Sequence, residues 1–265
     1  TARIQPVRVG RVVLFVQRAK RKILEFGLDD LALKYNAVDL TRLAEHITRG
    51  GIVEMAYAQE PNSVVWAVRN DGQLLSMTYR RIEDVVGWSR HKIGGVFGTG
   101  DSVVESVTII PGDNGAGQIQ YSTSRDEVWL IVKRTINGVT KRFIEVLERD
   151  FETGDDKNDA YYSDSLITYD STATTTITGL DHLEGETVKI WGDGAIRPDA
   201  TVASGSITLA ESVSVAQIGL ASKYILKTLK VVSGNPTGTP LGKKKRIYGL
   251  TFALLNSHTL QYGPD

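Results

Sequence analysis

The chain has 265 residues, contains no cysteine, and balances 31 lysines and arginines against 31 aspartates and glutamates. Without cysteine it can form neither a disulfide framework nor a thiolate-ligated zinc or iron–sulfur site, and no apolar run approaches the ~20 residues that cross a bilayer as a helix. Residues 1–150 hold 21 basic and 18 acidic side chains and the remainder 10 and 13, so neither half predicts a nucleic-acid-binding surface.

Along most of the chain the apolar residues recur with a period of two, which predicts β-strands. The first strands are expected at 12–18 and 22–26. These two strands match the second and third strands of the repeated units described below, so the first strand of their own unit is expected before Thr1. The chain also starts with neither methionine nor a signal sequence. We therefore expect the chain to be part of a longer protein.

One helix is expected at 40–48. Asp39 can cap its first turn, and two glycines at 50 and 51 can end it. The apolar residues with helical spacing are Leu40, Leu43, Ala44 and Ile47. This stripe predicts a short helix laid over the edge of a sheet.

A four-stranded antiparallel meander is expected next, between about 51 and 93. Its strands are expected at 51–57, 63–69, 73–79 and 85–91. The dipeptide Asp71–Gly72 separates the second strand from the third, and Asp-Gly supplies the backbone conformation that a tight hairpin needs.

The same pattern recurs, with strands expected at 102–110, 126–134 and 141–147. Asn137–Gly138 takes the place of Asp71–Gly72, and Trp129 takes the place of Trp66. A partial third copy is expected near the N-terminus, with residues 12–18 aligned to 128–134.

Repeated four-stranded meanders predict a mainly β protein with a partial, propeller-like first domain over residues 1–151. About two and a half blades cannot close a ring, because closed propellers have about four to eight. An open arc and a propeller completed by further sequence both remain open. A β-sandwich built from similar hairpins is the alternative fold.

An acidic, glycine-containing linker is expected at 152–163, followed by a small β-barrel domain over 164–265. Strands of this domain are expected at 172–178, 186–191, 200–202, 206–209, 213–218 and 246–255. The basic run 243–246 fits a solvated entry to the last strand better than a phosphate-binding patch. Asp155, Asp156, Asn158 and Asp159 could ligate calcium, although a solvated linker is the favoured interpretation.

The sequence predicts no catalytic residue, no cofactor and no metal site. The four histidines, His46, His91, His182 and His258, lack metal-ligand spacing. The tryptophans alternate with apolar neighbours in strands, which favours core packing. Trp88, Asp181 and Glu184 are the candidate glycan contacts, because an exposed ring can stack on a sugar and paired carboxylates can act on a glycosidic bond.

Several segments resemble a recurring structural protein of tailed bacteriophages. They are residues 12–26, 44–47, 51–66 with 59–63, 128–143 with 132–138, and 179–188. The resemblance is to the nozzle, or distal tail-tube, component of short-tailed phages. The C-terminal part also resembles the small barrel labelled as the first catalytic cysteine half-domain of ubiquitin-activating enzymes. Thioester chemistry is unavailable to this chain, because it has no cysteine.

The resemblance implies a non-catalytic structural component of a phage or prophage tail. It implies a homo-oligomeric ring, contacts with other tail proteins, no specific nucleic-acid binding and no membrane span. It also implies a place in the virion tail after synthesis in the cytoplasm of the bacterial host. Two alternatives remain: a carbohydrate- or receptor-binding tail module, and a propeller glycosidase that uses Asp181 and Glu184.

Overall fold

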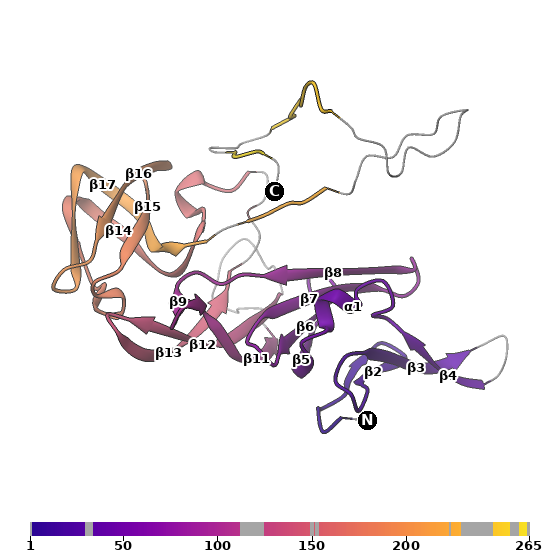
Figure 1. The fold of residues 1–265 in the computed structure, drawn as a ribbon. Helices are drawn as coiled ribbons and strands as arrows, with labels where there is room; N and C mark the ends of the chain where they lie inside the picture. Colours follow the sequence, from indigo (N-terminus) through magenta and orange to yellow (C-terminus); the bar gives the residue numbers. More distant parts are fainter. Residues whose placement is uncertain are drawn as a thin grey trace. The chain divides into compact units, whose positions relative to one another are not determined.

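The computed structural model describes residues 2–29, 34–111, 125–148, 151, 154–222, 224–228, 246–254 and 260–263 (Figure 1). The protein is mainly β, as expected, and its strands form several antiparallel sheets. The chain divides into two compact units, residues 1–224 and 225–265. All strands and helices assigned in the described residues belong to the first unit. The domain boundary expected at 152–163 stays a prediction.

The first sheet has the strand order β1-β2-β3-β4. Its strands are β1 (Val7–Val9), β2 (Val12–Val16), β3 (Ile23–Asp29) and β4 (Lys34–Asp39). The expectation that the first strand of this unit lies before Thr1 is wrong, because β1 takes that place and pairs with β2 across a two-residue turn. Gly10 in this turn has a φ of +57°. Three residues with a central arginine were too short to show an alternating pattern.

The helix is shorter than expected: α1 spans Glu45–Thr48, and 40–43 form turns. The Asp39 carboxylate accepts hydrogen bonds from the Thr41 amide at 2.9 Å and the Thr41 hydroxyl at 2.6 Å. These bonds close a local turn that competes with the helix. Leu43 is accordingly 95% exposed, whereas Ile47 is buried. No helix in the described residues is long and apolar enough to cross a membrane.

The second sheet confirms the expected meander, with the order β5-β6-β7-β8. Its strands are β5 (Ile52–Ala58), β6 (Val64–Arg69), β7 (Leu74–Arg80) and β8 (Val85–His91). A two-stranded sheet follows, formed by β9 (Val96–Phe97) and β10 (Gly100–Asp101).

The third sheet has the order β11-β12-β13, from β11 (Val103–Pro111), β12 (Asp126–Ile136) and β13 (Val139–Leu147). Its second hairpin turns at Asn137 and Gly138, as expected. Their φ angles of +49° and +75° are those of the tight turn that matches the twist of paired strands.

The second sheet is covered on both faces within the first unit. One face of β6 and β7 packs against the first sheet through Val65, Ala67, Leu75 and Met77. The opposite face packs against the third sheet through Trp66, Val68 and Leu74. Four consecutive apolar residues, 65–68, are therefore buried on alternating sides of the sheet, which explains why this strand does not alternate with polar residues.

One backbone contact recurs at both of these sheet junctions. The Ile52 amide at the start of β5 donates to the Lys20 carbonyl in the β2–β3 turn at 2.7 Å. The Val104 amide in β11 donates to the Gly72 carbonyl in the β6–β7 turn at 2.9 Å. Lys20 and Gly72 both have positive φ, +62° and +83°. The first strand of each following sheet is therefore hydrogen-bonded to a hairpin turn of the preceding one.

The expected alignment of β2 with β12 is displaced by one residue. Val12, Leu14 and Val16 face the second sheet, which follows β2 in the chain. Val128, Leu130 and Val132 also face the second sheet, which precedes β12. Since neighbouring strand residues point to opposite faces, a shift of one residue exchanges the faces. Trp66 faces the following sheet, and Trp129 likewise points away from the preceding one.

The fourth sheet has the order β14-β17-β15-β16. Its strands are β14 (Ser163–Thr178), β15 (Thr187–Gly192), β16 (Ala195–Thr201) and β17 (Ser206–Ala221), with short 3-10 helices η1 (Lys157–Asp159) and η2 (Asp181–Leu183). The segments expected as strands 206–209 and 213–218 are one continuous strand. Register shifts between β14 and β17 mark bends in both strands, whose inward side chains share one core.

The strand expected at 246–255 is wrong for 246–254, which are described and carry no strand. No described strand pairs with this segment, so its backbone lacks the ladder hydrogen bonds that define a strand. Leu255, His258 and the basic residues 243–245 lie outside the described residues.

The Gly72 turn should be intolerant of a side chain. A Cβ at Gly72 would overlap Val103 Cγ1 and lie 2.9 Å from Val103 Cα. We expect Gly72→Ala to lower the free energy of unfolding by about 2–4 kcal/mol through backbone strain and overpacking. Gly138→Ala is the matched control, since φ is also positive there but no atom lies within 4 Å. It should cost about 1–2 kcal/mol. Urea unfolding measures both, and equal losses would contradict a tight junction.

Candidate functional site

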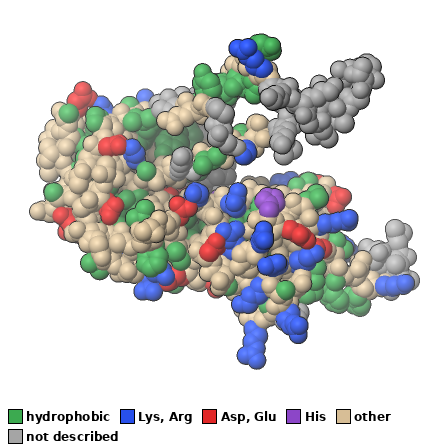
Figure 2. Space-filling model, viewed as in Figure 1, with side chains coloured by type: hydrophobic (Ala, Val, Ile, Leu, Met, Phe, Trp, Pro, Cys, Tyr) green, Lys and Arg blue, Asp and Glu red, His purple; other side chains and the backbone are tan. Residues whose placement is uncertain are grey.

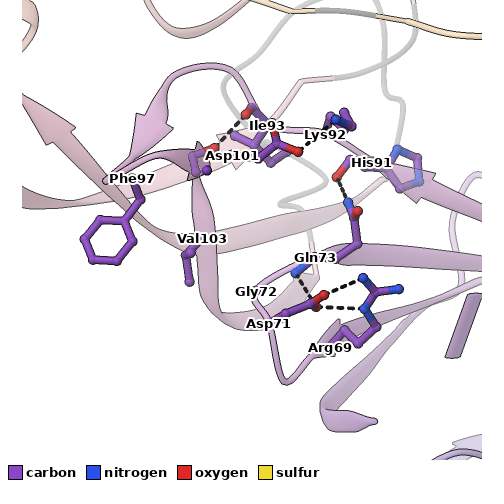
Figure 3. A pocket seen from close by; sticks show the side chains of 12 residues that line it. Arg69, Asp71, Gly72, Gln73, His91, Lys92, Ile93, Phe97, Asp101 and Val103 are labelled. Carbon is purple, nitrogen blue, oxygen red and sulfur yellow. Dashed lines mark hydrogen bonds and ion pairs between the residues drawn. The ribbon is translucent and has the colours of Figure 1, made fainter. Parts of the chain in front are cut away.

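A polar pocket of about 360 Å³ lies where the β6–β7 hairpin, the end of β8 and the segment from β9 to the start of β11 meet (Figure 3). Such a volume suits a small ligand. The charged and amide side chains that line it are Arg69, Asp71, Gln73, Lys92 and Asp101.

The charged groups of the pocket are paired with one another. Arg69 Nε donates to Asp71 Oδ1 at 2.7 Å, and a second guanidinium nitrogen donates to Oδ2. This hydrogen bonding is the main reason that the pKa of Asp71 lies below its ordinary value. Arg69 also donates to the Ile47 carbonyl at 2.9 Å, which fixes its orientation. Lys92 and Asp101 form a second, more exposed ion pair at 2.8 Å.

His91 closes one side of this pocket. Its Nε2 lies 2.7 Å from the Ser76 hydroxyl, and its ring lies 5.0 Å from the Trp66 ring. Burial lowers the pKa of His91, so the imidazole is neutral at pH 7. Its backbone carbonyl accepts from the Gln73 amide at 2.6 Å. The lining thus offers oriented ion pairs and an amide, which suit a hydroxyl-rich ligand better than an apolar one.

Phe97 does not form a stacking platform inside the pocket. Figure 3 shows its side chain pointing away from the Arg69–Asp71 pair. The Lys133 ammonium lies 4.4 Å from the centre of its ring, in cation–π contact. A sugar in the pocket would therefore be bound by polar groups.

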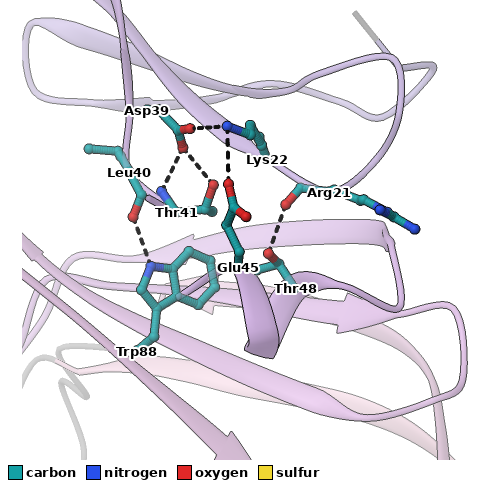
Figure 4. Close-up of polar contacts among 8 residues, drawn as sticks. All are labelled: Arg21, Lys22, Asp39, Leu40, Thr41, Glu45, Thr48 and Trp88. Atoms are coloured by element: carbon teal, nitrogen blue, oxygen red, sulfur yellow. Dashed lines mark hydrogen bonds and ion pairs between the residues drawn. The ribbon is translucent and has the colours of Figure 1, made fainter. Parts of the chain in front are cut away.

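The structure places Trp88 against the core rather than in this pocket. The Trp88 indole donates to the Leu40 carbonyl at 3.0 Å and packs on the cluster between the first and second sheets (Figure 4). Nearby, Lys22 bonds to Asp39 at 2.6 Å and to Glu45 at 3.3 Å. Trp88 thus joins β8 to the turn before α1, and core packing accounts for it.

Asp181 begins η2 and Glu184 follows it, in the connection between β14 and β15, whereas Trp88 lies on β8. Glu184 accepts from the Ser204 amide at 3.0 Å and the Gly205 amide at 2.8 Å. These backbone hydrogen bonds lower the pKa of Glu184, chiefly the bond from Gly205. A carboxylate held ionised in this way is poorly suited to act as the general acid of a glycosidase.

The described residues contain no group of three or more histidine and acidic side chains that could hold a metal ion. In the acidic segment, Asp156 accepts from the Asn158 amide at 2.9 Å and caps η1. His182 contacts the Ser165 carbonyl at 3.0 Å. These groups have structural partners, and they stand apart from one another.

Sequence reasoning missed Arg134, which is fully buried in β12. Its Nε donates to the Gly94 carbonyl at 2.7 Å, and its terminal nitrogens form a bidentate ion pair with Glu145 on β13. The Gly94 amide in turn donates to Asp164 on β14 at 2.6 Å. One signal was available: Arg134 holds an inward position in the series Val132, Arg134, Ile136.

A scan of the chain against protein-family models finds no match, and a search of curated proteins finds none either.

Glu184 is expected to hold the turn at Ser204 and Gly205. Replacing it with alanine removes the acceptor of both amides, and we expect those two amides to exchange with deuterium faster. Glu184→Gln, which keeps one oxygen acceptor, should retain part of the protection. Residue-resolved hydrogen exchange measures the effect. Unchanged exchange at both amides in Glu184→Ala would contradict this role.

Asp164 should make stability depend on pH. Burial raises its pKa above the ordinary 3.8, so the folded chain keeps a proton that the unfolded chain loses. Stability contributed by this group therefore falls as pH rises from about 4 through the raised pKa. We expect Asp164→Asn to melt progressively higher, relative to the unaltered chain, as pH rises from 4 to about 7. Asp170→Asn, at an exposed position on the same strand, controls for the loss of a charge. A difference independent of pH would contradict this prediction.

Proposed function

We propose that this chain is a non-catalytic structural component of a bacteriophage or prophage tail, in the nozzle or distal tail assembly. The resemblance of its motifs to such proteins supports the proposal. The structural observation that carries it is the succession of three antiparallel meanders packed face to face through apolar side chains. Sheets packed in this way suit a structural part of a larger assembly.

The finer fold belongs to the same proposal. The first strand of the second sheet, β5, contacts β1 of the first sheet and β11 of the third. First strands that lie side by side, with later strands further out, are typical of propeller blades. We take the three sheets as part of a propeller-like arrangement. The bent β14 and β17 around a single core support a small barrel in the fourth sheet.

Two carboxylates, those of Glu184 and Glu145, are engaged in structural contacts, which agrees with a structural role. Glu184 is occupied by backbone amides, and Glu145 is paired with a buried guanidinium. The balanced charge of the chain suits a piece that contacts other tail proteins and its own copies in a ring more than one that binds nucleic acid. The proposed location is the virion tail, after synthesis in the bacterial cytoplasm.

The pocket of Figure 3 favours a second candidate, a carbohydrate- or receptor-binding tail module. Its Arg69–Asp71 pair and Gln73 amide could bind sugar hydroxyls. In this candidate the glycan would lie in the pocket at Arg69, Asp71 and Gln73, and not at Trp88 or Asp181. The third candidate, a glycosidase, has less support because the Glu184 carboxylate is already engaged.

Labelling of virions tests the proposal. Antibodies raised against the chain, bound to particles from an induced lysogen or a phage that encodes it, should decorate one end of the tail in electron micrographs. Antibodies adsorbed with the purified chain serve as the control. Absence of the chain from purified particles would contradict the structural role. Glycan-array binding that Gln73→Ala abolishes would support the second candidate instead.

A further inference from the structure

The first sheet carries an apolar face that its neighbour does not cover. The exposed apolar residues on this outer face are Val13, Phe26, Leu28 and Tyr35. The Phe26 and Tyr35 rings stack at 5.2 Å, and Tyr35 is 70% exposed. Figure 2 shows hydrophobic side chains gathered at the surface over β3 and β4. We call this surface the Phe26 face.

The third sheet carries a second apolar face, on the side away from the second sheet. Ile110, Ile131 and Ile144 are exposed there, the last by 74%. Trp129 and Val146 are half-buried directly opposite each other on β12 and β13. The hairpin of β9 and β10 reaches only the far end, where the Gly98 amide donates to the Thr135 hydroxyl at 3.1 Å. We call this surface the Trp129 face.

β2, which contributes to the Phe26 face, and β12, which contributes to the Trp129 face, resemble β6 in sequence, and β6 is buried on two sides. β2 reads Val-Val-Leu-Phe-Val and the centre of β12 reads Val-Trp-Leu-Ile-Val, as continuously apolar as β6. Strands with one solvated face alternate apolar with polar residues. The first and third sheets therefore have sequences suited to a second neighbour.

The two faces are of complementary kinds. The Phe26 face of the first sheet is equivalent to the face of the second sheet that packs against the first sheet, through Val65, Leu75 and Met77. The Trp129 face of the third sheet is equivalent to the face of the second sheet that packs against the third sheet, through Trp66 and Val68. Together they are the two halves of the junction that already occurs twice in the chain.

We infer that a second copy of this chain covers these surfaces, with the Trp129 face of one copy packed on the Phe26 face of the next. Charged side chains border both surfaces: Arg8 lies on the Phe26 face, and Glu127, Lys133 and Arg142 lie on the Trp129 face. The contact is heterologous, so it builds a ring where the rotation closes and a filament where it does not. This inference rests on the proposed structural role and names the surfaces that assemble.

Two charge substitutions test the inference in the full chain. Phe26→Asp disables one face and Ile144→Asp the other, and both sites are exposed, so folding should persist, as circular dichroism can verify. Analytical ultracentrifugation should show assemblies for the unaltered chain and single chains for each variant. An equimolar mixture of the variants should form a dimer and stop there, because each supplies one intact face. Ile82→Asp, in the exposed β7–β8 turn, is the control and should assemble normally.

Three results would overturn the inference. The first is an unaltered chain that stays single at its highest soluble concentration. The second is an Ile144→Asp variant that still dimerises while Phe26→Asp does not, which would indicate a symmetric contact between two Phe26 faces. The third is assembly that neither substitution affects. That third result would leave the structural role standing, whereas absence of the chain from virions would contradict the role and not the interface.

Discussion

An apolar sheet face is stable in water only when something covers it, and the arrangement of the first three sheets follows from this constraint. In each of the three sheets one strand, β2, β6 or β12, contains a run of successive apolar residues, so each sheet has apolar side chains on two faces. The second sheet meets the requirement with neighbours on both sides. Apolar burial does not by itself fix how two sheets are oriented, because its free energy depends on the area buried more than on orientation. The turn-to-strand hydrogen bonds at Lys20 and Gly72 fix this orientation, since each joins a particular turn to a particular strand.

The fourth sheet is joined to the third in a different way. Arg134 connects Glu145 of the third sheet with the Gly94 carbonyl, and the Gly94 amide contacts Asp164 of the fourth. A buried ion pair adds little net stability, because both charges lose their hydration. Its directional hydrogen bonds instead require one arrangement of the groups they join. A Cβ at Gly94 would lie 2.6 Å from the Ala221 carbonyl, so the backbones approach closely here. The junction therefore combines fixed polar geometry with the core shared by Ile136 and β17.

Most strands could be predicted from the sequence, because continuous or alternating apolar runs between Gly-containing turns are local signals. β1 was missed since three residues carry too little pattern, and the helix was overextended because the Asp39 side chain closes a turn first. The one-residue displacement of β2 against β12 depends on which neighbour covers which face, and no local pattern contains that information. The candidate site was harder still. Trp88 packs on the core, and Glu184 accepts hydrogen bonds from a turn. The pocket at Arg69 is lined by residues of five strands and of the segments that connect them, and only the packing of the sheets brings these residues together.

The connection of consecutive strands within each sheet affects how the chain can emerge from a ribosome. Each of the first two sheets is complete before the first strand of the next is made. The second sheet spans Ile52–His91, about 40 residues, and at synthesis rates of about 5–20 residues per second it takes about 2–8 s to appear. During that time the finished first sheet exposes an apolar surface suited to a partner that has not yet been made. Neighbouring ribosomes on the same message would then carry matching uncovered surfaces close together.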